Sequence, residues 1–115
     1  MASAFSKVDD TPRWDRQRAR WLIGKHAVVA ITRLAGDKET VIEQDQYHGI
    51  IVAVHKAKGI RINCLGAMTG KQRTLPPDTS AFEDAEPGEY WLKTTGEKII
   101  DPDIVSTWTL SAPLH

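Results

Sequence analysis

The sequence has a single cysteine and no long apolar run, and each shortage removes a class of protein. Cys64 has no second cysteine to pair with, so the disulfide framework of small secreted domains is excluded. No apolar stretch approaches the roughly 20 residues of a membrane-spanning helix. The first ten residues lack the apolar core of a signal peptide. We therefore expect a single-domain cytoplasmic protein that does not associate with membranes.

The net charge is zero, because 15 lysines and arginines balance 15 aspartates and glutamates. The charges are nevertheless segregated along the chain. No acidic residue occurs from 46 to 77, whereas after Phe82 the acidic residues outnumber Lys93 and Lys98. A neutral total argues against a dedicated nucleic-acid-binding protein, but a segregated distribution can steer a charged partner.

The N-terminal part has the spacing of a short amphipathic helix. Thr11 is a suitable N-cap and Pro12 suits the first helical position, where its missing N–H costs nothing. Apolar and long side chains then recur at helical spacing, at Trp14, Arg18, Trp21 and Leu22, before Gly24 ends the pattern. The sequence predicts a helix over residues 11–24.

From His26 onward the pattern changes to the alternation of short strands. Strands are predicted at 26–34, 40–54 with a bend at Gly49, 60–65, 71–75, 90–94, 98–100 and 105–110. Residues 83–89 are predicted to be an acidic loop. The spacing is typical of a small antiparallel β-barrel of SH3-like or Sm-like type. We expect a mostly β domain over 11–110, with flexible ends at 1–10 and 111–115.

Four segments carry a resemblance: RWLIGK at 20–25, TLPPD at 74–78, PGEY at 87–90, and DPD at 101–103 with TWT at 107–109. They resemble a group of small bacterial proteins of unassigned function, over about residues 12 to 110. The resemblance implies a bacterial cytosolic protein. It implies no catalytic or binding residue.

Two groups of residues are candidates for an enzyme site or a metal site. Cys64 with His48 or His55 would make a cysteine nucleophile and its base, but Cys64 shares a strand face with two isoleucines, which favours a buried thiol. His26, His48 and His55 lack the paired spacing of zinc ligands. We expect no cofactor, no metal and no catalysis, and keep a Cys64–histidine enzyme as an alternative.

A nucleic-acid-binding barrel is another alternative. Its candidate residues are the cations of the basic stretch, Lys56, Lys58, Arg61, Lys71 and Arg73. Single strands bind to basic grooves that also carry stacking aromatic residues, yet no aromatic residue lies between Tyr47 and Phe82. A solvated hairpin is the simpler interpretation of this stretch.

The four tryptophans favour a third reading, a non-enzymatic protein-binding module. Trp21 and Trp108 are expected in the core, and Trp14 or Trp91 on the surface. The candidate binding residues are Trp14 and Trp91 with the acidic Glu83, Asp84 and Glu86. An inhibitor or immunity-type protein that blocks a bacterial toxin is one form of this hypothesis. Unpaired strand edges would also allow a homo-oligomer.

Overall fold

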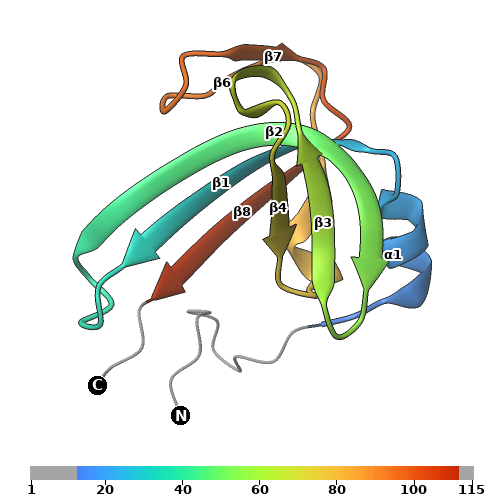
Figure 1. Ribbon diagram of the computed structural model, residues 1–115, viewed down its shortest axis with the longest axis horizontal. Coiled ribbons are helices and arrows are strands. Elements are labelled where there is room, and N and C mark those ends of the chain that lie inside the picture. Colours follow the sequence, from blue (N-terminus) through green and yellow to red (C-terminus); the bar gives the residue numbers. More distant parts are fainter. Residues whose placement is uncertain (1–12, 112–115) are drawn as a thin grey trace.

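Strands dominate the computed structural model, which describes residues 13–111 (Figure 1). The elements in chain order are α1 (Arg16–Leu22), β1 (His26–Leu34), β2 (Val41–His55), β3 (Gly59–Cys64), the 3-10 turn η1 (Gly66–Met68), β4 (Gln72–Leu75), the 3-10 turn η2 (Thr79–Ala81), β5 (Phe82–Asp84), β6 (Glu89–Trp91), β7 (Lys98–Ile100) and β8 (Ile104–Ser111). The prediction of a mostly β fold with one N-terminal helix is confirmed. Of the ends predicted to be flexible, 1–10 and 112–115 lie outside the described residues, and Ser111 ends β8.

Six strands form one sheet in the order β4-β3-β2-β1-β8-β5, and β6 and β7 form a separate two-stranded sheet. Most neighbours are antiparallel, but β1 and β8 are parallel over their whole length. The expectation of a purely antiparallel barrel is therefore wrong. β4 and β5 are the two edges of the described sheet, which is curved and mixed.

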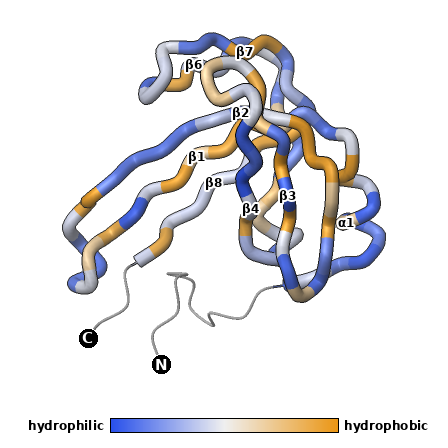
Figure 2. Tube along the Cα trace, viewed as in Figure 1, coloured by the Kyte–Doolittle hydropathy of each residue, from blue (hydrophilic) through white to orange (hydrophobic). Residues whose placement is uncertain are grey.

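The long strand β2 arches over the molecule and joins its two ends (Figure 1). Figure 2 shows that β2 starts apolar, at Val41 and Ile42, continues as a hydrophilic stretch and is mostly apolar in its second half. Gly49 lies where the arch meets β3: a Cβ atom there would stand 2.3 Å from the backbone oxygen of Asn63. The glycine predicted to interrupt this strand therefore allows close approach of the neighbouring backbone.

One face of the curved sheet holds the main core. Alternate residues point inward along each strand, so Val29, Tyr47 and Ser106 lie side by side on this inner face. The buried members of the core are Leu22, Ala27, Val29, Ile31, Tyr47, Ile51, Ile60, Ile62, Cys64, Leu75, Phe82, Ile104 and Trp108.

The helix is shorter than its sequence pattern predicted. Asp15, not Thr11, is the N-cap, and its side chain accepts a hydrogen bond from the Arg18 N–H at 3.0 Å. Residues 11 and 12 lie outside the described part of the chain. Leu22 is fully buried, and the Gly24 N–H donates to the Ile51 carbonyl at 2.8 Å. These contacts fix α1 against the second half of β2.

The acidic segment predicted to be a loop begins with a strand instead. Phe82 is buried, and Glu83 and Asp84 are exposed, as β5 pairs with the start of β8. Arg18 of α1 donates to the Phe82 carbonyl at 2.9 Å. Because this pairing joins residues about twenty positions apart, local sequence pattern does not reveal it.

The outer face of the sheet is covered at one end by the β6–β7 hairpin, seen at the top of Figure 1. Leu92 and Ile99 of the hairpin pack against Val28 of β1 in a second apolar cluster, with Tyr90 and Val105 at its margin. The hairpin is therefore a small second layer on the main sheet.

Candidate functional site

The outward side of the β6–β7 hairpin bears an apolar pair that nothing in the described chain covers. Trp91 and Ile100 are each 61% exposed. Trp91 lies opposite Lys98 and Glu89 lies opposite Ile100, so the two apolar residues are diagonal neighbours. We call the four outward residues Glu89, Trp91, Lys98 and Ile100 the hairpin face. Lys98 bonds Glu89 at 3.3 Å and lies 5.4 Å from the centre of the Trp91 ring.

The turn of the hairpin is fastened to β2 through one glutamine. The Gln46 side-chain oxygen accepts from the N–H groups of Lys93 and Thr94. The Gln46 backbone N–H and carbonyl both bond the Thr94 hydroxyl at 3.2 Å. The hairpin face is therefore held in a fixed position on the sheet rather than on a free loop.

A chain of three titratable side chains makes a second attachment. His26 Nε2 lies 2.9 Å from His48 Nδ1, and His48 Nε2 lies 3.2 Å from Glu97 Oε2. The same carboxylate oxygen accepts from the Ala67 N–H of η1 at 3.1 Å. His26 is on β1, His48 on β2 and Glu97 at the end of the hairpin turn, so the chain links both layers.

The chemistry of these groups fixes where the protons lie. An ionised carboxylate only accepts, so His48 Nε2 carries the proton that bonds Glu97. In neutral His48 the other ring nitrogen, Nδ1, is then an acceptor, and His26 Nε2 donates to it. The hydrogen-bonded series His26–His48–Glu97 accommodates one additional proton without losing a hydrogen bond, because His26 can also be protonated at Nδ1, the nitrogen that does not face His48. A second additional proton would place two N–H groups face to face.

The surroundings shift two of the three groups. Burial, with the neighbouring His48 second, lowers the pKa of His26, although Asp103 acts in the opposite direction. Burial alone would raise the pKa of Glu97, but hydrogen bonds from Thr95, the Ala67 N–H and His48 outweigh it and hold the pKa below its ordinary value. Both shifts favour neutral His26 and ionised Glu97 near neutral pH.

The sequence offered His26 and His48 only as weak metal candidates, and their pairing with Glu97 was not predicted. Val28 lies opposite His48 and His26 opposite Ile50, so the histidines are diagonal neighbours on one face. The sequence could have predicted this neighbourhood, because the turn at 35–38 makes the two strands antiparallel and strand alternation places both histidines on one face. Glu97 comes from a hairpin far away in the sequence, so no local pattern predicts its contact with His48. His55 is elsewhere, where its Nδ1 accepts from the N–H groups of Ala57 and Lys58 at 3.0 Å.

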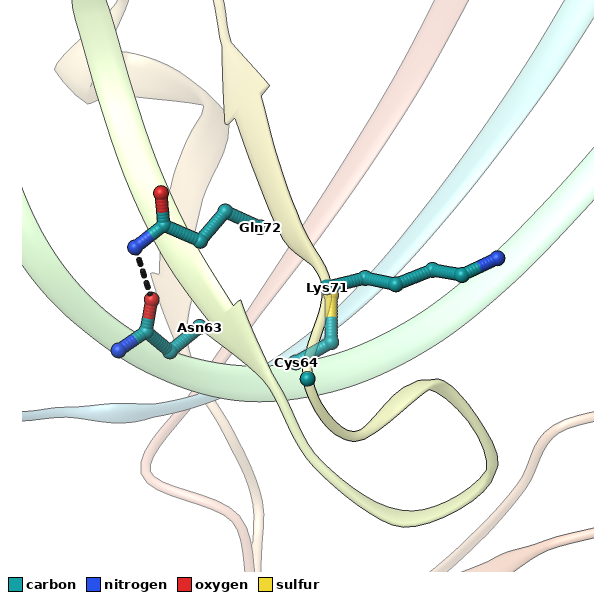
Figure 3. Close-up of a pocket in the computed structure, with 5 residues that line it drawn as sticks. Asn63, Cys64, Lys71 and Gln72 are labelled. Carbon is teal, nitrogen blue, oxygen red and sulfur yellow. Dashed lines mark hydrogen bonds between the residues drawn. The ribbon is translucent and has the colours of Figure 1, made fainter.

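Cys64 does not meet a histidine. It faces the core opposite Gly49, whereas His48 is on the outer face, and burial raises the pKa of the thiol. An open depression of about 570 Å³ borders it, with Asn63, Gly70, Lys71 and Gln72 as the other lining residues. Figure 3 shows the Asn63–Gln72 hydrogen bond, 2.6 Å long, and the Lys71 side chain extending away from it. This arrangement provides neither a base nor a thiolate.

The five cations of the predicted nucleic-acid surface are distributed over different parts of the fold. Arg61 points outward from β3, whereas Arg73 points inward from β4 and forms an ion pair with Asp45. Lys56 and Lys58 lie in the exposed turn before β3, and Lys71 lies beyond its other end. The structure therefore does not assemble them into one basic groove.

The protein-binding candidates also separate into groups. Trp91 is the most exposed tryptophan, Trp14 is partly buried against the main core, and Trp108 is buried. Trp21, expected in the core, is 39% exposed and lies beneath Arg18 and Lys25. The acidic candidates Glu83, Asp84 and Glu86 are exposed on and after β5, and Asp84 pairs with Arg18 at 3.5 Å.

Tyr47 contains a buried hydroxyl that has no hydrogen-bond partner among the described residues. Its side chain is 1% exposed, the Arg73 guanidinium lies 4.7 Å from its ring centre, and burial raises its pKa. Replacing Tyr47 by phenylalanine removes only the unpaired group, so we expect the free energy of unfolding to stay within about 1 kcal/mol or to rise. Urea unfolding measures it; a loss above about 2 kcal/mol would mean that the hydroxyl has a partner.

Within residues 13–111, no three histidine, cysteine, aspartate or glutamate side chains converge in a way that could hold a metal ion. No helix in the same range is long and apolar enough to cross a membrane. No protein-family model matches the chain, and no curated protein or solved structure matches it either.

Proposed function

We propose that this protein is a non-enzymatic binding module whose hairpin face docks on another protein. The observation that carries the proposal is the pair Trp91 and Ile100, adjacent to one another and each 61% exposed. Single exposed apolar residues are common on monomeric proteins. A tryptophan beside an isoleucine on a face fixed by Gln46 and Glu97 is a preorganised anchor of the kind that dominates interface energies.

Charge indicates which partner would fit. From Glu83 to Asp103 the chain has seven acidic residues and two lysines, Lys93 and Lys98. Lys98 is already paired with Glu89, so the segment of chain that carries the hairpin face is acidic. A partner with an apolar pocket and a basic rim would complement this surface and associate faster at low salt.

The order of strands from β1 to β4, followed by η2, supports an SH3-like or Sm-like relationship for this part of the sheet. An inhibitor or immunity-type role in a bacterial cytoplasm fits an acidic surface that displays a rigid aromatic anchor. A second copy of this chain, with its own basic stretch, is the alternative partner that the test below separates.

The test is affinity capture with matched baits. We expect the wild-type protein to retain a stoichiometric protein partner that the Trp91→Ala and Ile100→Ala variants retain at least about tenfold less well. Ile42→Ala is the control, since Ile42 is 60% exposed at the far end of β2. Equal capture by all baits, or capture of nucleic acid released by salt, would contradict the proposal. Size-exclusion chromatography of the bait identifies self-association.

A further inference from the structure

Two hydrogen bonds determine which backbone groups of the β6–β7 hairpin face each other between its strands. The Leu92 N–H donates to the Glu97 carbonyl at 2.8 Å, and the Asp101 N–H donates to the Gly88 carbonyl at 2.9 Å. In an antiparallel pair, residues that bond the partner strand alternate with residues whose N–H and C=O groups point away from it. The even-numbered residues of β6 and the odd-numbered residues of β7 therefore bond each other.

The residues that alternate with these are the four of the hairpin face. The N–H and C=O groups of Glu89 and Trp91 point away from β7, and those of Lys98 and Ile100 point away from β6. Since β6 and β7 form a two-stranded sheet, neither edge has a neighbouring strand among residues 13–111. Each edge of the hairpin therefore combines unpaired backbone groups with an exposed apolar side chain.

The two edges differ in what surrounds them. η1 lies against the start of the β7 edge, because the Ala67 N–H donates to the Glu97 carboxylate at 3.1 Å. The β7 edge also has Lys98, and a lysine on a sheet edge opposes pairing with another strand. The β6 edge has no lysine, and the chain that leads to it, residues 83–89, has four acidic residues and no basic one. β6 is therefore the edge that suits an added strand with basic residues.

We propose that the protein partner contributes an extended segment that adds to β6 as a third strand of the hairpin sheet. Main-chain hydrogen bonds to Glu89 and Trp91 provide affinity, and alternate side chains of the segment provide specificity. The segment residues beside Glu89 and Trp91 are two positions apart, so they point to the same face. Charge favours a lysine or arginine beside Glu89, and the exposed ring favours an apolar residue beside Trp91.

This inference rests on the proposed function, because it specifies how the partner reaches the hairpin face. A second copy of this chain does not have the required chemistry at its own β6 edge. Two β6 edges side by side would bring two acidic segments together, and like charges on adjacent strands are destabilising. The occupant is therefore an extended segment of a different protein.

Proline at position 89 tests the main-chain contact, because it removes one edge N–H and leaves Trp91 and Ile100 in place. Proline is tolerated on edge strands. In affinity capture, we expect Glu89→Pro to retain the partner at least about fivefold less well than Glu89→Ala, the matched control that keeps the N–H. Lys98→Pro removes an N–H from the β7 edge and should retain the partner as well as Lys98→Ala does.

Amide hydrogen exchange of the complex eluted from the wild-type bait is a second measurement, which does not depend on the folding of a variant. We expect the Glu89 and Trp91 amides to gain at least about tenfold in protection relative to the free protein. The Lys98 and Ile100 amides should gain less, because their N–H groups are on the opposite edge.

Strand addition and the proposed function can fail separately. If Trp91→Ala and Ile100→Ala weaken capture but Glu89→Pro equals Glu89→Ala, the hairpin face binds without strand addition. Equal protection of both edges, or a retained partner that is a second copy of this chain, would also overturn strand addition. If the wild-type bait retains no protein partner, both proposals are wrong.

Discussion

Gly49→Ala is expected to be strongly destabilising, with a loss of at least about 3 kcal/mol in the free energy of unfolding. The added Cβ would stand 2.3 Å from the Asn63 backbone oxygen and 2.7 Å from Ile62 Cγ2. Backbone cannot swing aside as a side chain can, so β2 and β3 would have to separate at the centre of the sheet.

Gly24→Ala is the control for this prediction. Gly24 has a φ of +86° but nothing within 4 Å of an added Cβ, so alanine there adds conformational strain without a clash, about 1 kcal/mol. Urea unfolding of both variants gives the comparison. A Gly49→Ala loss no larger than that of Gly24→Ala would show that the two strands are not held as close as described.

The second large effect is expected at Gly66→Ala, at about 2–4 kcal/mol. Gly66 has a φ of +64°, and an added Cβ would stand 1.7 Å from Glu97 Oε2 and 2.7 Å from His48 Nε2. The Glu97 carboxylate would have to leave, which breaks its bonds to His48 and Ala67. We expect a loss of global stability together with faster exchange at Lys93 and Thr94.

Gly70→Ala is the matched control, because Gly70 is close by in the sequence, has a φ of +93° and has open space around it. It should cost about 1 kcal/mol and leave exchange at the hairpin turn unchanged. If Gly66→Ala and Gly70→Ala behave alike in both measurements, Glu97 does not hold the turn.

The parts of the fold that the sequence predicts are those governed by local pattern. In β3 the buried Ile60, Ile62 and Cys64 alternate with the exposed Arg61 and Asn63, which is the expected register of a half-buried strand. Gly49 was predicted to mark a bulge or sharp bend, but β2 is continuous through it and its register shift lies between Ile51 and Ala53. Gly49 instead allows the backbone of β3 to approach closely.

Features set by distant contacts were not predictable in the same way. The parallel pairing of β1 with β8 joins the two ends of the domain, and no local pattern specifies its direction. Competition among caps explains the helix start, since Asp15 and Thr11 are both good N-caps. In the candidate site, alternation beside Tyr90 and Leu92 predicts that Trp91 points outward, whereas the link from Glu97 to His48 depends on tertiary structure.

The central claim is that the hairpin face is the surface a protein partner contacts, and site-specific photo-crosslinking tests it most directly. Trp91 would be replaced by p-benzoylphenylalanine and, in a second variant, Ile42 would be replaced in the same way, because both positions are about equally exposed on different parts of the fold. We expect irradiation in the native cell to give one discrete protein adduct from position 91 and none from position 42. No adduct from position 91, or the same adduct from both positions, would contradict the claim.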